Sequence, residues 1–306
     1  MRQSLVSILQ LIRLPNVITA AADSLAGWLL VGGALGETSG WLPLAGASMC
    51  LYTAGMALND YFDLEVDRRE RPGRPLPSGR VPPRVAAGIG WGGLALGLLL
   101  ALVAGAGGLS STLVVGFLLA LAILSYNAGL KQTFLGPPAM GSCRALNLLL
   151  GMSVAPGLGG PVAWLAAGAF GLFVAGVTWI SRSEAFGGET RNLLVGLTLQ
   201  NLAFLGLAAA ALMPGRFPNP SADRPLVPLE GLLILGTIAV VVNNAAARAI
   251  REPTPKFFQL AVKTGVLSLV WLDVALVASV RGPSPAFAVA LLWLPAFLLA
   301  RWLYST

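Results

Sequence analysis

The sequence predicts an all-α integral membrane protein, a bundle of nine to ten transmembrane helices. Hydrophobic residues make up 56% of the 306 residues and charged residues 11%, and the mean hydropathy is +0.77. Apolar runs of about 20 residues, the length that crosses a bilayer as a helix, recur from one end of the chain to the other. Because only short polar stretches separate these runs, we expect residues 1–306 to form a single transmembrane helical domain.

Ten apolar segments are the expected spans, in chain order. They cover about residues 14–35, 41–62, 84–106, 109–127, 138–158, 162–182, 191–213, 229–250, 260–280 and 284–304. The first follows Arg13-Leu14-Pro15-Asn16, where proline suits a helix start. The third and fourth are rich in glycine and alanine, a composition typical of closely packed membrane helices.

The distribution of basic residues indicates how these spans are oriented. With the N-terminus in the cytoplasm, 17 of the 20 lysines and arginines fall on the cytoplasmic side, and only Arg216, Arg224 and Arg281 fall outside. Arg13 and Pro15 interrupt the early apolar region, so the start carries little of a signal peptide and we expect the first helix to remain. We expect an integral protein of the bacterial inner membrane with a cytoplasmic N-terminus.

Composition also excludes several classes of site. The net charge of +7 is spread over many loops, which speaks against a nucleic-acid partner. Histidine is absent, which removes the usual general base and the usual haem or zinc ligand. Cys50 and Cys143 lie in separate spans and form no metal pair. Asp23 and Asp273 lie within spans, where an acid is costly and by default paired or functional. The sequence names no partner for Asp23. Asp273 pairs with Lys263 only if a third helix turn brings the two together, and it fits an acceptor site equally well.

A polar stretch, residues 59–80, separates the second and third spans. Asp60, Asp63 and Asp67 stand at i, i+3 and i+7, so a helix would project all three from one face. Each such like-charge pair costs about 0.2–0.5 kcal/mol, which a divalent cation such as Mg²⁺ would reverse. Prolines at positions 72, 75 and 77 then end the helix, and the loop carries Arg74 and Arg80, whose guanidinium groups suit phosphate. The alternative is a solvated loop with positive-inside charge.

At these residues the chain resembles a known family. Asn59-Asp60-x-x-Asp63-x-x-x-Asp67-Arg68, followed by Arg71-Pro72-x-Arg74-Pro75-Leu76-Pro77-Ser78-Gly79, is similar to the first aspartate motif of the UbiA superfamily of intramembrane prenyltransferases. The resemblance implies a transferase that moves an isoprenoid chain from its diphosphate to an acceptor, with Mg²⁺ as cofactor. It implies that Asp60, Asp63 and Asp67 are catalytic and bind the metal, and that Asn59, Arg68 and Arg74 bind substrate.

The resemblance extends to other helix ends. Asn16 stands where the family often has a polar residue near the diphosphate, although it equally fits a proline-led helix start. Tyr126 and Lys131 resemble the tyrosine and lysine that follow the fourth span, where lysine helps to hold the diphosphate; the alternative is an interfacial tyrosine beside an inside-positive lysine. Arg144 either adds a phosphate ligand or extends to the cytoplasmic surface.

The second aspartate motif of the superfamily is altered here. Its position reads Thr178-Trp179-Ile180-Ser181-Arg182-Ser183-Glu184-Ala185-Phe186, without aspartate. Glu184 aligns with the second acid and is the acidic residue carried over as catalytic, while Ile180 takes the place of the first. Arg182 is expected to bind the diphosphate in place of a second metal ion. The change resembles a UbiA-like branch of the EboC type, in which Ser-Arg-Ser-Glu-Ala replaces the motif.

Two functions follow from these observations. The first is transfer of a prenyl group from a Mg²⁺-bound prenyl diphosphate to an aromatic or other lipid-soluble acceptor. The second is a non-catalytic membrane protein that binds or transports a prenyl lipid through the first motif only. The altered segment 181–189 and the intramembrane acids Asp23 and Asp273 favour the second function.

Overall fold

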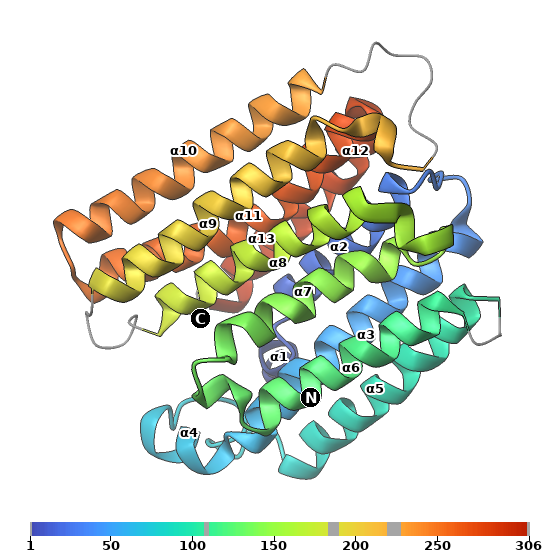
Figure 1. Ribbon diagram of the computed structural model, residues 1–306. Coiled ribbons are helices and arrows are strands. Elements are labelled where there is room, and N and C mark those ends of the chain that lie inside the picture. Colours follow the sequence, from blue (N-terminus) through green and yellow to red (C-terminus); the bar gives the residue numbers. More distant parts are fainter. Residues whose placement is uncertain (1, 107–109, 183–189, 219–227, 305–306) are drawn as a thin grey trace.

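The computed structural model describes residues 2–106, 110–182, 190–218 and 228–304, and within these ranges every regular element is helical (Figure 1). The α-helices are α1 (Arg2–Leu11), α2 (Leu14–Leu30), α3 (Thr38–Phe62), α4 (Leu64–Glu70), α5 (Pro83–Ala104), α6 (Ser111–Ala128), α7 (Gly136–Met152), α8 (Gly160–Ser181), α9 (Thr190–Ala211), α10 (Leu229–Arg251), α11 (Pro255–Arg281), α12 (Pro283–Leu291) and α13 (Trp293–Tyr304). Short 3-10 turns are η1 (Leu130–Gln132), η2 (Pro156–Gly159) and η3 (Pro214–Arg216). The predicted all-helical fold is confirmed.

All ten predicted spans coincide with helices, although several are shorter than expected. In the described part of the chain, eight helical segments are long and apolar enough to cross a membrane, and the pair α1–α2, bent by 49°, makes a ninth. The first expected span, 14–35, ends at Leu30, and the fifth, 138–158, ends at Met152. α7 has 17 residues, which is the lower limit for a span. The bend between α1 and α2 lies at Arg13, whose φ of 52° is left-handed.

The helices run back and forth along the bundle, so that alternate connections meet at the same end. Figure 1 shows the α3–α4 corner, the turn from α6 to α7 and the turn from α10 to α11 at one end, where α8 stops and α9 begins. The last turn of α5, the first turn of α6 and the α7–α8 connection lie at the opposite end. Residues from the aspartate segment, from η1 and from the end of α8 therefore share one end of the bundle.

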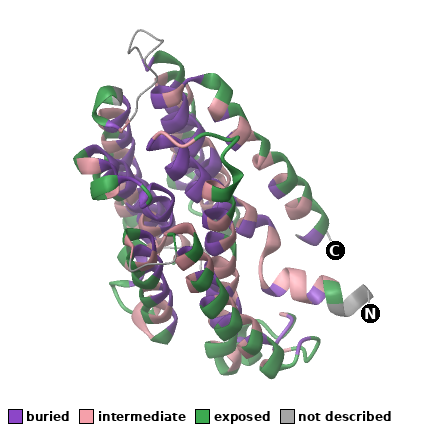
Figure 2. Ribbon diagram, turned by 90° about the vertical axis from the view of Figure 1, so that its right-hand side faces the viewer, coloured by how far each residue is buried: buried purple, intermediate pink, exposed green. Residues whose placement is uncertain are grey.

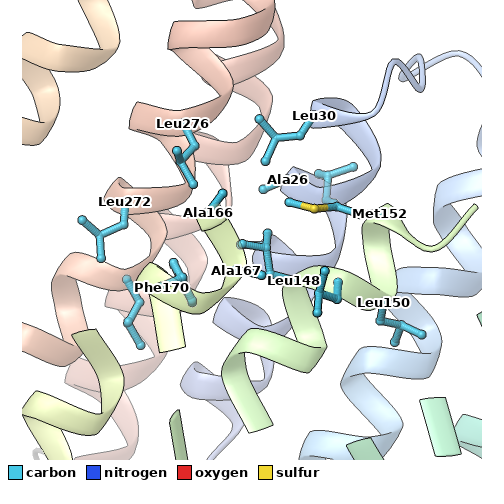
Figure 3. Close-up of a cluster of buried hydrophobic side chains, with 14 of the residues drawn as sticks. Ala26, Leu30, Leu148, Leu150, Met152, Ala166, Ala167, Phe170, Leu272 and Leu276 are labelled. Carbon is cyan, nitrogen blue, oxygen red and sulfur yellow. The ribbon is translucent and has the colours of Figure 1, made fainter. Parts of the chain in front are cut away.

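The core lies where α2, α7, α8 and α11 meet. Side chains such as Leu30, Leu148, Phe170 and Leu272 fill this space (Figure 3) and are almost fully buried. Outside the core, large apolar residues of α5 and α6, including Trp91, Leu99 and Phe117, are about half exposed. Figure 2 shows the same division between a buried interior and an exposed outer surface. An apolar outer surface on long apolar helices is what a bilayer requires, and the protein is an integral membrane protein.

Close packing of α2 against α7 depends on two glycines. A Cβ on Gly27 would lie 2.3 Å from the carbonyl oxygen of Leu148, and one on Gly151 would lie 2.0 Å from that of Ser24. Both distances are shorter than any van der Waals contact, so larger residues would force the helices apart. Small residues allow membrane helices to approach in this way. The approach brings the side chains of α2 within reach of those of α7.

Candidate active site

The three aspartates of the segment lie at a break between two helices, the long α3 and the short α4, rather than on one helix. α3 ends at Phe62, Asp63 is the residue between α3 and α4, and Asp67 lies in α4. The expectation of one continuous helical face is wrong in this respect. The helical register is nevertheless carried across the break, since the amide of Asp63 donates to the Asn59 carbonyl at 3.0 Å and that of Asp67 to the Asp63 carbonyl at 2.8 Å. All three aspartates therefore remain at the same corner of the bundle, at the end of α3, which we call the aspartate corner.

Arg74 joins the two buried aspartates. Its Nη1 lies 2.7 Å from Asp67 Oδ2 and 3.6 Å from Asp60 Oδ1. Arg13, at the bend before α2, has its Nη2 3.9 Å from Asp60 Oδ1. Asp60 and Asp67 are each only 4% exposed, so their charges need such partners. The proline-rich loop after α4 thus folds back over the aspartates that precede it, as a basic loop for phosphate would.

Lys131 binds the third aspartate. α6 ends at Ala128, and Gly129, with φ of 155°, turns the chain into η1, which carries Lys131. Its Nζ lies 2.7 Å from Asp63 Oδ1 and donates to Asn59 Oδ1 at 3.1 Å. Tyr126 lies in the last turn of α6, shortly before the turn that carries Lys131. The structure therefore brings Lys131, and with it the end of α6 that carries Tyr126, to Asn59 and Asp63, although Lys131 and Asn59 are 72 positions apart.

These carboxylates suit a magnesium ion by their chemistry. Mg²⁺ binds one or two carboxylates and completes its shell with water and phosphate oxygens. Asp60 and Asp67 share one guanidinium group, and Asp60 Oδ1 is buried without a hydrogen-bond partner among the described residues. The described part of the chain contains no three His, Cys, Asp or Glu side chains already converging as a metal site. Each aspartate is instead paired with a cation that a bound diphosphate would also attract.

Two predicted residues of the described part of the chain, Arg68 and Asn16, form no hydrogen bond or ion pair with the aspartates of this corner. Arg68 pairs with Glu65, and both side chains are exposed. Asn16 lies in the first turn of α2, where its backbone carbonyl accepts from Thr19 Oγ1 at 2.8 Å. Glu184 lies outside the described residues.

Arg182 occupies the neighbouring corner at the end of α8. Its Nη2 donates to the backbone carbonyl of Thr133, in the turn before α7, and its guanidinium carbon lies 5.5 Å from the centre of the Trp179 ring. The side chain is exposed. Ile180, beside it, is 1% exposed and packs into a small cluster with Leu193 and Phe258.

Arg144 lies in the middle of the bundle, away from the aspartate corner. Its Nη1 donates to Asp23 Oδ2 at 2.7 Å, its Nη2 donates to Thr19 Oγ1 at 3.1 Å, and its guanidinium carbon lies 5.1 Å from the Tyr52 ring centre. Asn147 Nδ2 donates to the same Asp23 oxygen at 2.9 Å. Arg144 therefore extends neither to the membrane surface nor to the aspartate corner, and Asp23 has the partner that sequence reasoning did not find. The available signal was the opposite charge of Asp23 and Arg144, since charged residues within membrane spans usually pair with one another.

Sequence reasoning also missed Arg13 as a site residue, because its position at a span boundary is equally typical of a topology signal. The left-handed conformation at the α1–α2 bend directs it to Asp60. Sequence periodicity gives no indication of that bend. The available signal was an arginine two positions before the proline that starts α2.

The fold and this corner define the class of the protein: an all-helical membrane protein with paired carboxylates and cations at one end of an apolar bundle. The chain belongs to the UbiA prenyltransferase family, whose sequence profile matches residues 20–213. It is 33% identical over 268 residues to a digeranylgeranylglyceryl phosphate synthase of Halobacterium salinarum, an alignment that covers 80% of this chain and 88% of that protein. Other relatives match over shorter stretches: the synthase of Methanothrix thermoacetophila is 44% identical over 81 residues, 26% of this chain and 30% of that protein.

Solved structures agree on the fold. A structure of digeranylgeranylglyceryl phosphate synthase superposes with a TM-score of 0.63 at 20% identity and covers 91% of this chain and 99% of its own. A UbiA homologue from Archaeoglobus fulgidus bound to DMAPP and Mg²⁺ superposes with a TM-score of 0.60 at 15% identity, covering 85% of this chain and 97% of its own. At these identities the likeness establishes the fold.

Proposed function

We propose that the protein transfers a prenyl group from a magnesium-bound prenyl diphosphate to a hydrophobic acceptor within the membrane. The observation that carries this proposal is the corner where Asp60 and Asp67 share Arg74 while Asp63 holds Lys131. Such a corner offers carboxylates for a metal and cations for phosphate oxygens, at the end of a bundle whose interior is largely apolar. The family relationship and the long alignment with a named synthase support it.

The residues of this corner would have different roles in the reaction. Asp60 and Asp67 would hold Mg²⁺, which neutralises diphosphate charge when bound. Arg74, Arg13 and Lys131 would turn from the carboxylates to the diphosphate oxygens, with the arginines able to bind two oxygens at once. The bond between the prenyl carbon and the diphosphate oxygen breaks, and diphosphate leaves with the electron pair.

The acceptor then completes the reaction. Its nucleophilic atom bonds to the prenyl carbon, and the proton that it loses goes to the departing diphosphate. The apolar bundle would exclude water, which would otherwise capture the prenyl cation. Tyr126, at the same corner, has an aromatic face that can stabilise that cation. Glu184 and Arg182 stay predicted contributors from the end of α8.

A direct assay tests the proposal. Purified protein in detergent is given radiolabelled geranyl diphosphate, Mg²⁺ and a set of phenol, quinol and glycerol-ether acceptors, and both binding and diphosphate release are measured. We expect binding that EDTA abolishes and release that depends on the acceptor. Tight, metal-dependent binding without release for any acceptor would instead indicate the prenyl-lipid carrier, which the altered segment at the end of α8 favours. The cytoplasmic N-terminus and the bacterial inner membrane stay predictions.

A further inference from the structure

The outer surface of the bundle has a groove between α10, α11 and α13. Its volume is about 600 Å³, within the range of about 300–1,000 Å³ that ligand pockets usually have. Leu233 and Val241 of α10 line it and are 63% and 49% exposed, so the groove is open along its outer side. Since long apolar helices form this surface, the groove opens toward the bilayer. Lipid molecules can therefore enter it directly from the membrane.

The wall of the groove is suited to an apolar chain. None of the described residues that line it is charged, and Trp271 of α11 and Trp293 of α13 contribute aromatic rings whose centres lie 5.9 Å apart. The hydroxyl groups of Thr237 and Ser268 donate at 2.8 Å to carbonyl oxygens one turn earlier in their own helices. Because these hydrogen bonds use the hydroxyl protons, the wall offers a ligand apolar contact above all.

Two exposed basic residues continue the groove toward the end of the bundle that carries the aspartate corner. Arg248 follows Val241 by seven positions in α10, and Lys263 precedes Leu267 by four positions in α11. Residues at these spacings lie on one face of a helix, so both cations stand on the faces that form the groove. Neither forms an ion pair with another described residue. Both are therefore available to an anion.

A third exposed cation stands near the end of α13. The guanidinium carbon of Arg301 lies 5.9 Å from the centre of the Phe297 ring, and this ring stacks on that of Trp293 at 4.8 Å between centres. The carbonyl of Leu303 accepts a hydrogen bond from Gln10 Nε2 at 3.1 Å, which places the end of α13 beside α1, near the bend between α1 and α2. Stacked rings therefore lead from the groove to a basic residue of α13.

The charges at this end of the groove favour an anion. Residues 248–263 contain four basic residues and one acidic residue, Glu252. At the aspartate corner, in contrast, Arg13, Arg74 and Lys131 pair with three aspartates. The 27 residues of α11 measure about 40 Å as a helix, about 10 Å more than the hydrocarbon core of a bilayer. The ends of α11 therefore reach the level of the lipid headgroups, and the basic residues of the α10–α11 turn lie there.

We propose that the groove binds an anionic phospholipid of the surrounding membrane, with its acyl chains against Trp271 and Trp293 and its phosphate group in contact with Arg248 and Lys263. Basic residues at the membrane surface attract anionic headgroups, and the apolar wall accommodates the chains. This site is separate from the aspartate corner and does not depend on prenyl transfer. As a ligand of the folded state alone, the lipid stabilises the edge of the bundle that α10 forms.

Lipid binding to the wild-type protein tests the proposal. Tritiated dioleoylphosphatidylglycerol and tritiated dioleoylphosphatidylcholine are titrated onto protein purified in dodecyl maltoside. We expect the anionic lipid to bind at least about tenfold more tightly at low salt, since each basic residue near an anionic headgroup contributes about fivefold. Higher salt should reduce this difference. Equal binding of the two lipids at low salt overturns the proposal.

Two further measurements locate the lipid. Asp67→Asn, which removes a carboxylate from the aspartate corner, should bind phosphatidylglycerol like the wild type; a large change would place the lipid at that corner and contradict the proposal. Glycerol 3-phosphate, at the same concentration as the lipid, should not displace it, because this competitor lacks acyl chains. Complete displacement would show a site for free phosphate and also contradict the proposal.

Two double variants assign the headgroup contact. Arg248→Gln combined with Lys263→Gln should lower affinity for phosphatidylglycerol about tenfold and leave that for phosphatidylcholine unchanged. Arg84→Gln combined with Arg191→Gln removes the same charge from exposed residues at the starts of α5 and α9, outside the groove, and should bind like the wild type. An equal loss in both double variants would indicate general attraction to a positive surface and contradict the site.

A second matched pair tests the groove itself. Thr237→Trp places a large side chain in the groove and should weaken the binding of both lipids severalfold. Val240→Trp introduces the same side chain on an exposed position of α10 that does not line the groove, and should have no effect. Undiminished binding by Thr237→Trp contradicts the groove as the site. Size-exclusion chromatography checks that each variant is folded, and the wild-type comparison of the two lipids decides the proposal without any substitution.

Discussion

The ends of α3 and α8 lie at the same end of the bundle but are built from different chemistry (Figure 1). At the end of α3, Asp60 is 4% exposed and is compensated by Arg74 and Arg13. At the end of α8, Ile180 is 1% exposed and packs among aliphatic and aromatic side chains, with Arg182 exposed beside it. The end of α3 carries buried carboxylates paired with cations. The described part of the α8 end carries packed apolar side chains instead. The ends of two helices in one bundle thus differ in their chemistry: one carries buried charges and the other buried apolar side chains.

Restoring an acid at the α8 end should therefore destabilise the protein rather than rebuild a metal site. Ile180→Asp would bury a carboxylate in a cluster that contains only apolar side chains, Leu193, Ala246, Ala249, Phe258 and Ala261. We expect a loss of at least about 3 kcal/mol in the free energy of unfolding, because unpaired buried charge is among the costliest changes. Denaturant titration in detergent measures it, with Ile180→Val, at about 0.5–1.5 kcal/mol, as the control. A stable Ile180→Asp protein with a steeper Mg²⁺ dependence of binding would show that the two ends are equivalent.

Removing an acid at the α3 end should affect binding instead of stability. Asp67→Asn keeps the size of the side chain but removes the charge that faces Arg74. We expect affinity for geranyl thiodiphosphate to fall at least 100-fold, about 2.7 kcal/mol, because metal affinity depends on carboxylate charge. Equilibrium binding with and without EDTA measures it. Glu65→Gln, an exposed residue of the same helix that pairs with Arg68, should bind like the wild type; an equal loss in both variants would show a general charge effect.

Replacement of Arg74 or of Arg182 by lysine compares the two helix ends with the smallest expected effects. Arg74 holds two buried carboxylates, whereas Arg182 donates to a backbone carbonyl at the surface. Arg74→Lys should weaken diphosphate binding about tenfold, since lysine lacks the guanidinium fork, and Arg182→Lys less than threefold. Competition binding against radiolabelled geranyl diphosphate resolves both effects. A tenfold loss in Arg182→Lys would mean that Arg182 replaces the second metal ion, as the sequence led us to expect.

Sequence patterns predicted most of the residues that come together at the end of α3, but few of the contacts in the middle of the bundle. Asp60, Asp63, Asp67 and Arg74 lie within 15 positions of one another, so a local motif holds them. Lys131 was found only through resemblance to a family, because it reaches Asn59 across 72 positions. The break at Asp63 was not predicted, since acid spacing at i, i+3 and i+7 is the same in a straight helix and in a kinked one.

The sequence by itself determined that this is a helical membrane protein, and it predicted a polar corner for a metal and a diphosphate. Hydropathy and short motifs are local properties, and the bilayer acts on each apolar segment in the same way. Only the tertiary structure decided that Arg144 meets Asp23 across 121 positions, that Asp273 stands behind them and that Asn127 Oδ1 is left without a partner in the described part of the chain. These pairings depend on which helices approach closely, and that is set by glycine contacts such as Gly27 with α7, which no single segment encodes.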